Sequence, residues 1–161
     1  LEGDGWEDIL RFVQARDISW RFIEFMRTND NSEYHQQQAT PGETVREKLL
    51  AAGWKPQMRE VGSGPAVDYA HPAYRGRIGL IAPYSPGFCE SCNRLRLSSR
   101  GRLHLCLFGT EGLDLRDLLQ HDEQQDELVT RIVAAMPGKT RGHRLNEGNS
   151  GATPHLASIG G

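Results

Sequence analysis

The sequence lacks several features that define large classes of proteins. It has no apolar run of about 18 residues, the length that spans a bilayer, and no positively charged and then apolar leader. We therefore expect a cytoplasmic protein with no membrane partner. The first residue is Leu1 rather than methionine, so we also expect the chain to be taken up partway through a longer protein.

Cysteine is scarce, and so is net charge. The 161 residues include three cysteines, an odd number for a disulfide framework, and a reducing compartment would keep them as thiols that can bind metal. The formal net charge is -2. Because a domain that binds nucleic acid usually carries a clear positive excess, we expect no nucleic-acid partner.

Positive charge is nevertheless concentrated in one part of the chain. The stretch 72–109 contains six arginines and a single acid, Glu90. A local basic cluster in a nearly neutral chain favours a small anionic ligand. A solvent-exposed basic hairpin would give the same pattern, so both interpretations stay open at this point.

The N-terminal part of the sequence predicts a helix followed by a strand. Apolar residues recur at helical spacing over 6–16, which predicts an amphipathic helix. Residues 18–26 are dense in β-branched and aromatic types at both parities, which predicts a strand buried on both faces. Such a pair is half of a βαβ unit, whose parallel neighbours would precede it. The polar stretch 28–39 predicts a surface loop.

A second helix is predicted over 40–53. Thr40 and Glu43 have the spacing of a capping box, and Pro41 would stand at the first helical position. Gly53 is the expected stop.

The remaining part reads as a sheet followed by helices. The expected strands are 57–61, 66–70, 77–82, 94–98 and 102–108. The turn residues 99–101 predict a hairpin between the last two strands, so we expect an antiparallel sheet. Helices are predicted over 113–120 and 126–135, and composition alone predicts a disordered tail from Pro137.

The three cysteines have the spacing of a metal site. Cys89 and Cys92 share a tight loop, and Cys106 lies 14 residues further, across the predicted hairpin. They fit three thiolate ligands of an iron-sulfur cluster, but a Cys3His zinc site with His104 fits equally well. A redox dithiol and buried free thiols are the weaker alternatives. The residues alone do not separate zinc from iron.

Arginines flank this proposed metal site. If 94–98 is a strand, Arg94 and Arg96 point to one side, and Leu95 and Leu97 to the other. A closed zinc site has little need of two guanidinium groups, whereas a cluster that faces a phosphorylated substrate would use them to hold phosphate.

Five segments together carry a resemblance to a known family. They are Arg21-Phe22-Ile23-Glu24-Phe25-Met26, the stretch 77–81, the cysteine segment 88–97, the stretch 101–107 and the terminal Gly160-Gly161. With them the chain resembles molybdenum cofactor biosynthesis protein A, the radical S-adenosylmethionine (SAM) GTP 3′,8-cyclase, collinearly over essentially its whole length.

The resemblance implies an α+β fold. It implies the terminal helix and strand of an incomplete radical-SAM α/β barrel, followed by a C-terminal iron-sulfur domain with an antiparallel sheet and helices. On this basis 1–33 would be the C-terminal end of the barrel and 34–150 the domain that binds a 4Fe-4S cluster and GTP. The tail with its double glycine would be 151–161.

The resemblance also implies roles for individual residues. Cys89, Cys92 and Cys106 would ligate a 4Fe-4S cluster with one open iron that meets the guanine of GTP. The implied GTP-binding residues are Arg94, Leu95 and Arg96.

Further roles follow from the same resemblance at the two ends of the chain. Met26 would lie beside SAM, and Arg21 would face the active-site cavity as a catalytic residue. Gly160 and Gly161 would close a tail that inserts toward the active site, where a residue without a side chain fits.

One family feature is absent. The first cluster of the family needs a Cys-x3-Cys-x2-Cys motif, and all three cysteines present here are already assigned. We therefore expect that this chain cannot cleave SAM by itself, and that its missing partner is the N-terminal barrel. Apolar surface left exposed by that absence would favour a homodimer.

Overall fold

The computed structural model describes residues 4–59, 62–90, 92–109, 112–139, 142–151, 155 and 157. Their contacts divide the chain into two units, each of which is described by itself. Unit 1 contains Leu1–Phe25 and Ala39–Ser91, and unit 2 contains Met26–Gln38 and Cys92–Gly161.

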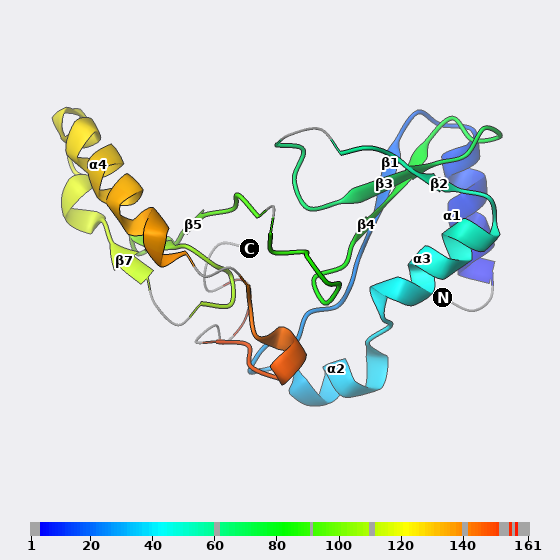
Figure 1. The fold of residues 1–161 in the computed structure, drawn as a ribbon, viewed down its shortest axis with the longest axis horizontal. Helices are drawn as coiled ribbons and strands as arrows, with labels where there is room; N and C mark the ends of the chain where they lie inside the picture. The colour runs from blue at the N-terminus through cyan, green and yellow to red at the C-terminus, as the bar shows by residue number, and fades with distance from the viewer. Residues whose placement is uncertain are drawn as a thin grey trace. The chain divides into compact units, whose positions relative to one another are not determined.

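Unit 1 combines a mixed sheet with two helices (Figure 1). Its elements are α1 Asp4–Gln14, β1 Ser19–Ile23, α3 Gly42–Ala51, β2 Lys55–Pro56, β3 Val67–Ala70 and β4 Arg77–Ile81. The four-stranded sheet has the order β1-β4-β3-β2. Strand β1 pairs with β4 in parallel, while β3 pairs antiparallel with both β4 and β2.

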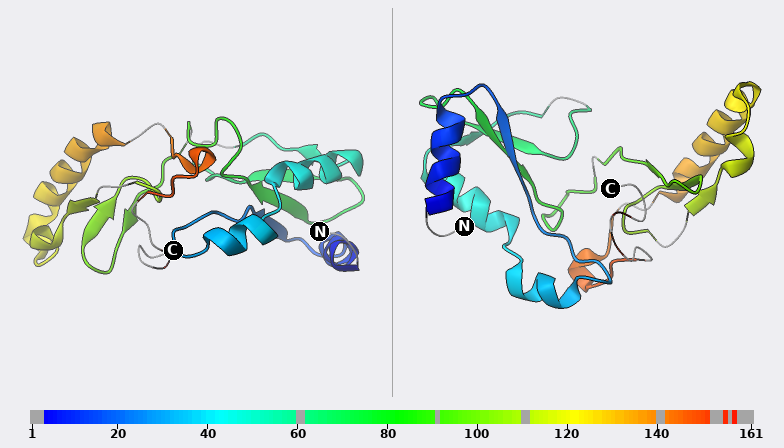
Figure 2. Two further views of the ribbon diagram at one scale, coloured as in Figure 1. Left: turned by 90° about the horizontal axis from the view of Figure 1, so that it is seen from below. Right: turned by 180° about the vertical axis from the view of Figure 1, so that it is seen from behind.

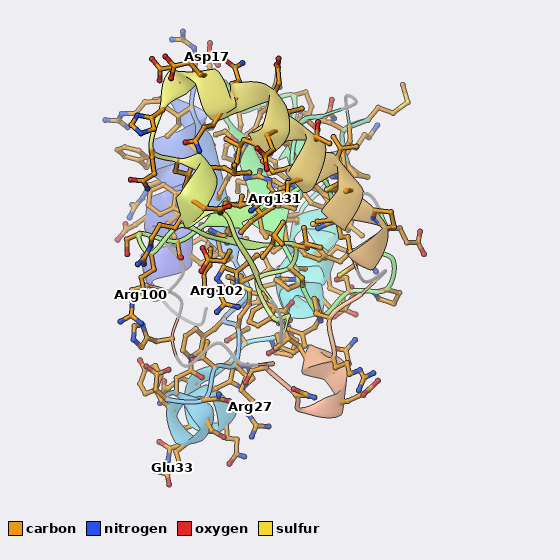
Figure 3. All side chains as sticks on the ribbon, turned by 90° about the vertical axis from the view of Figure 1, so that its left-hand side faces the viewer. Asp17, Arg27, Glu33, Arg100, Arg102 and Arg131 are labelled. Atoms are coloured by element: carbon orange, nitrogen blue, oxygen red, sulfur yellow. The ribbon has the colours of Figure 1, made fainter. Side chains whose placement is uncertain are left out.

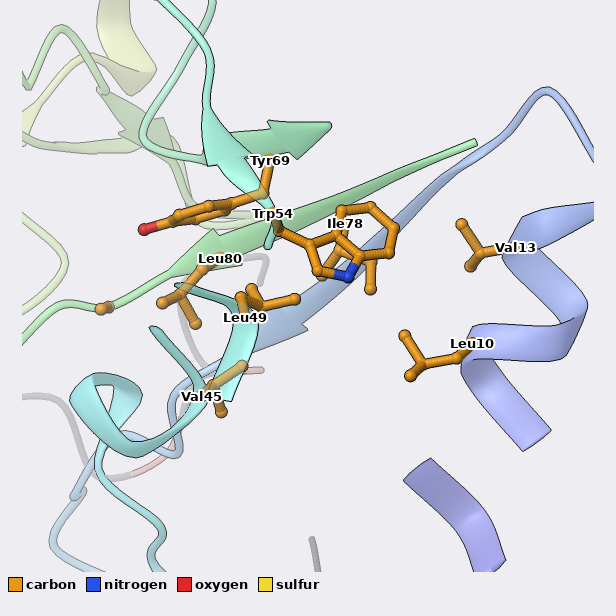
Figure 4. Close-up of a cluster of buried hydrophobic side chains, with 9 residues drawn as sticks. Leu10, Val13, Val45, Leu49, Trp54, Tyr69, Ile78 and Leu80 are labelled. Carbon is orange, nitrogen blue, oxygen red and sulfur yellow. The ribbon is translucent and has the colours of Figure 1, made fainter. Parts of the chain in front are cut away.

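The core of unit 1 lies between this sheet and its helices (Figure 4). Val13 of α1, Leu49 of α3 and Ile78 of β4 are fully buried. Each such side chain contributes about 1.5 to 3 kcal/mol of burial free energy. The helices predicted over 6–16 and 40–53 are both confirmed, and each places apolar residues in this core.

Strand β1 is present, but it is not buried on both faces as predicted, since Ile23 is 60% exposed. It lies at the edge of the sheet and pairs in parallel with β4, which follows it in the chain. The parallel neighbours expected to precede it stay a prediction. An edge strand with helices on one side cannot bury alternate residues on the other.

The start of α3 differs from the predicted capping box. Pro41 is the N-cap, and no side chain of the helix caps it. Instead, the Gly42 amide donates a hydrogen bond to Glu24 Oε1 at 2.8 Å, and the Tyr84 amide donates to Glu24 Oε2 at 3.2 Å. The helix stops as predicted at Gly53, whose φ of +85° suits a residue without a side chain.

Unit 2 contains a small antiparallel sheet and short helices (Figure 2). Its elements are α2 Ser32–Gln38, β5 Arg96–Leu97, β6 Arg102–His104, β7 Gly112–Asp114 and α4 Gln125–Ala135, with short 3-10 helices after β7, before and after α4, and at Leu145–Glu147. The strand order is β5-β6-β7. The predicted hairpin of β5 and β6 is confirmed, and so is the helix over 126–135.

Several predicted elements of unit 2 were wrong. The polar loop 28–39 contains α2, a helix with no buried residue and hence no apolar period to reveal it. The predicted helix 113–120 is strand β7 followed by a 3-10 helix at Arg116–Leu118, because residues 112–114 complete the edge of the small sheet.

Strand lengths were also overestimated. β6 ends at His104 and β5 spans two residues, while β2 lies before the predicted strand 57–61. The tail is ordered over 142–151, against its composition. Leu145 is 4% exposed, and the Ser150 hydroxyl donates to Asn29 Oδ1 at 2.7 Å.

The α+β class is thus confirmed, and the described residues contain no barrel. In place of a purely antiparallel sheet, the four-stranded sheet is mixed. The ranges 1–33, 34–150 and 151–161 remain predictions about a longer protein. None of the described helices is both long and apolar enough to cross a membrane.

Candidate functional site

The three thiols occupy loop positions in both units. Cys89 belongs to unit 1, in a series of turns after β4 where Gly87 has a φ of +74°. Cys92 and Cys106 belong to unit 2, one before β5 and the other just after β6. All three are half-buried and free of disulfides.

The described residues contain no assembled metal site. Within the described ranges, no three His, Cys, Asp or Glu side chains form a group that could hold a metal ion. The chemistry of the donor set still fits an iron-sulfur cluster, because three accessible thiols that are not committed to disulfides are what such a cluster requires. The metal site stays a prediction.

The arginine segment next to Cys92 is less regular than predicted. Strand β5 begins at Arg96, so Arg94 and Leu95 precede it and the predicted alternation fails for Arg94. Arg94 is exposed, Leu95 is 37% exposed and Arg96 is half-buried opposite His104. The GTP-binding roles of Arg94, Leu95 and Arg96 stay predictions.

Arg102 of the basic cluster has a structural partner. Its guanidinium donates to the Gly112 carbonyl at 2.8 Å and thereby ties β6 to β7. At Arg100 the bond uses the backbone, because the Arg100 carbonyl accepts from the Arg116 guanidinium at 3.0 Å. Arg100 and Arg102 are both labelled in Figure 3. At Arg102 the positive charge therefore also serves to hold the small sheet together.

Lys139 connects the two segments that carry the thiols of unit 2. Its ammonium group donates to the Arg94 carbonyl at 2.9 Å and also to the Leu105 carbonyl. These carbonyls lie two residues after Cys92 and one residue before Cys106. Lys139 thus holds the two segments at a fixed distance from each other. The sequence did not reveal this role, because Lys139 is remote from both segments along the chain.

His104, the fourth ligand of the zinc alternative, is half-buried on β6. Burial, and then the nearby Arg102 guanidinium, lower the pKa of His104 below its ordinary value. A neutral imidazole is the form that ligates metal. His104 therefore has the chemistry of a ligand, although strand β6 ends before Cys106.

The remaining predicted site residues lie at the two ends of the chain. Arg21 is on β1 in unit 1. Met26 follows that strand and belongs to unit 2, where its carbonyl accepts a hydrogen bond from the side-chain amide of Asn31 at 3.0 Å. Gly160 and Gly161 lie outside the described residues.

Two acidic residues of unit 1 were missed by sequence reasoning. Glu24 joins the chain after β1 to the start of α3, and Asp68 lies on β3 beside Arg21. The sequence did not reveal their roles, because the partners of both residues depend on which segments lie together in the sheet.

The chain is thus an α+β protein with a pair of thiols, a third thiol and an arginine segment next to the pair. Comparison with known protein families shows that residues 18–145 match the family Molybdenum Cofactor Synthesis C. The match extends over most of the chain, and the chain therefore belongs to this family.

Curated relatives give the comparison more detail. The GTP 3′,8-cyclase of Synechococcus elongatus is 51% identical over 154 residues, which cover 96% of this chain and 47% of the relative. That of Stenotrophomonas maltophilia is 52% identical over 156 residues, covering 97% and 47%. That of Haemophilus ducreyi is 51% identical over 155 residues, covering 96% and 46%. The chain thus spans about half the length of these relatives.

Proposed function

We propose that this chain is the GTP-binding, second-cluster part of a GTP 3′,8-cyclase in molybdenum cofactor biosynthesis. The observation that carries the proposal is the 51% identity, along 96% of this chain, to a protein named for that activity. The product of the full-length enzyme would be (8S)-3′,8-cyclo-7,8-dihydroguanosine 5′-triphosphate. Family membership supports the pathway, and the relative's name supports the substrate.

In this proposal the thiols hold a 4Fe-4S cluster. Cys89, Cys92 and Cys106 would supply three ligands, and the remaining iron would supply an open coordination position for the purine of GTP. Their free state and partial exposure support this role.

The arginine segment would hold the rest of the substrate. Arg94 and Arg96 present guanidinium groups that can form paired hydrogen bonds to phosphate oxygens. Leu95 between them is 37% exposed and would pack against the nucleotide. The contribution of this chain to catalysis is then positioning of GTP, while the cofactors carry the difficult chemistry.

The complete reaction would need more than this chain. We propose that the 161 residues alone are inactive, because their three cysteines leave none for a first cluster. In the full-length enzyme SAM would bind beside Met26, Arg21 would face the cavity, and Gly160 and Gly161 would enter it.

Anaerobic reconstitution of the chain with iron and sulfide tests the proposal. We expect about four irons per chain, and a strong decrease when any one cysteine is replaced by serine. GTP should change the spectroscopic signature of the cluster. Stoichiometric zinc with no iron uptake would overturn the proposal.

The zinc-stabilised Cys3His binding module is the alternative, and His104 decides between them. It lies at the end of β6, two residues before Cys106, and would be the fourth ligand of that site. Under the zinc alternative His104→Ala should release the metal. Under the cluster proposal the same variant should keep its iron, because only thiols are ligands.

A further inference from the structure

Arg21, Gly79 and Asp68 form a line across three adjacent strands of unit 1. Arg21 on β1 is in register with Gly79 on β4, and Gly79 is in register with Asp68 on β3. Because side chains alternate along a strand, these three residues share the face opposite the one on which Ile78 and Leu80 pack into the core. A cation and an anion thus meet on the face that faces away from the core.

Gly79 provides the space in which the two charged side chains approach each other. A Cβ atom at this position would lie 2.6 Å from Asp68 Oδ1 and 2.9 Å from Arg21 Cγ. It would also lie 3.3 Å from Arg21 Nε. Asp68 Oδ1 and Arg21 Nε therefore border the same space, which any side chain at position 79 would fill.

One oxygen of the Asp68 carboxylate accepts no hydrogen bond from the described residues. Its Oδ2 atom lies 3.9 Å from Arg21 Nη2, an ion-pair distance beyond that of a hydrogen bond. Its Oδ1 atom is buried, and no hydrogen-bond partner for it exists among the described residues. A buried carboxylate oxygen without a donor is unfavourable, so a donor that reaches it is strongly preferred.

The donor best placed to reach Oδ1 is the Arg21 guanidinium. Its side chain is 49% exposed and therefore has room to rotate, whereas that of Asp68 is 28% exposed and rests between strands. Rotation over Gly79 would convert the single ion pair into a two-point contact through both carboxylate oxygens. The guanidinium would then be held with its remaining N–H groups directed away from the sheet.

We propose that Asp68 is the positioning residue of Arg21: over the bare backbone of Gly79, it holds the guanidinium in the orientation that meets an anionic ligand. The inference rests on the proposed function, which puts Arg21 at the active-site cavity. A purely structural role accounts less well for the arrangement, because a partly exposed ion pair contributes little to stability.

The side-chain NMR signal of Arg21 Nε, assigned with an Arg21→Lys variant, tests the pairing directly in this chain. In the wild type we expect a resolved, slowly exchanging signal. Asp68→Asn should broaden or shift it, and Asp68→Glu, which keeps the charge, should restore part of it. Asp8→Asn is the matched control, since it removes an exposed Arg–Asp pair on α1 and should leave the Arg21 signal unchanged.

The charge-keeping variant Asp68→Glu keeps the pairing testable if Asp68→Asn does not fold. The Arg21 Nε signal should shift in Asp68→Glu and stay unchanged in Asp8→Asn. An Arg21 signal that is the same in the wild type and in the Asp68 variants would overturn the proposal.

GTP binding to the reconstituted chain separates this inference from the proposed function. We expect Asp68→Asn to weaken binding about tenfold with an unchanged melting temperature and iron content. The Arg21 signal could change in Asp68→Asn while the GTP affinity stays the same. This result would support the pairing of Asp68 with Arg21 and contradict the placement of Arg21 in a GTP site. If affinity falls while the signal is unchanged, the positioning role is wrong.

Discussion

Tyr69 lies on β3 in the core of unit 1, where it is 4% exposed. Burial raises the pKa of Tyr69 above its ordinary value of 10.0, because the phenolate is poorly solvated there. The unfolded chain therefore loses this proton at a lower pH than the folded chain. The stability that Tyr69 contributes is complete below pH 10.0 and decreases as the pH rises beyond it.

Tyr69→Phe should remove this part of the alkaline pH dependence. We expect the free energy of unfolding, from denaturant titrations at about pH 8 and about pH 11, to fall less in the variant than in the wild type. Tyr34→Phe is the control, because Tyr34 is 62% exposed. Equal alkaline losses in the wild type and Tyr69→Phe would contradict the prediction.

Arg94 and Arg96 give a prediction at the proposed GTP site. Arg94→Ala and Arg96→Ala should each weaken GTP binding by about 1 to 3 kcal/mol, the usual loss for a charge-assisted hydrogen bond, with no loss of iron. Calorimetric titration of the reconstituted chain measures this. Arg100→Ala, on the same hairpin, should bind as the wild type does, and an unchanged affinity in the first two variants would remove them from the site.

At the scale of elements, Glu24 connects β1 to α3. Its carboxylate accepts from the amides of Gly42 and Tyr84, so Glu24→Ala would leave two donors without their acceptor. We expect unfolding of unit 1 to become easier by about 1 to 3 kcal/mol. Glu47→Ala, on the exposed side of α3, is the comparison, and similar unfolding free energies for both variants would refute the role of Glu24.

Elements with an apolar period were predictable from the sequence, whereas α2 and β7 were not. Helices α1 and α3 place apolar residues on one side, and the sequence therefore reveals them. Helix α2 has no buried residue, and β7 exists only because it pairs with β6. Pairing across a sheet depends on segments remote in sequence, which a local pattern does not contain.

The candidate site divides in the same way. Cys89, Cys92 and Arg94 lie in one contiguous segment that the sequence displays. The line of Arg21, Gly79 and Asp68 appears only when the parallel pairing of β1 with β4 sets the register. A glycine in a strand signals a close approach of some kind, but not which side chains approach.

At the scale of the whole molecule, the chain spans about half of its relatives and leaves an unpaired sheet edge. Strand β1 is at the end of the four-stranded sheet, and no strand of the described residues pairs with its outer side. Trp20 and Ile23 on this strand are 36% and 60% exposed. An open edge with exposed apolar side chains favours association with another chain.

We therefore expect the isolated chain to self-associate through β1, and Ile23→Lys to reduce this association. A charge on an edge strand opposes pairing with a second strand at little cost to the fold when the site is exposed. Sedimentation velocity over a range of concentrations measures the effect. Val133→Lys is the control, because Val133 is 62% exposed and lies on helix α4, not on a strand. If both variants dissociate equally, or if neither does, β1 is not the surface of association.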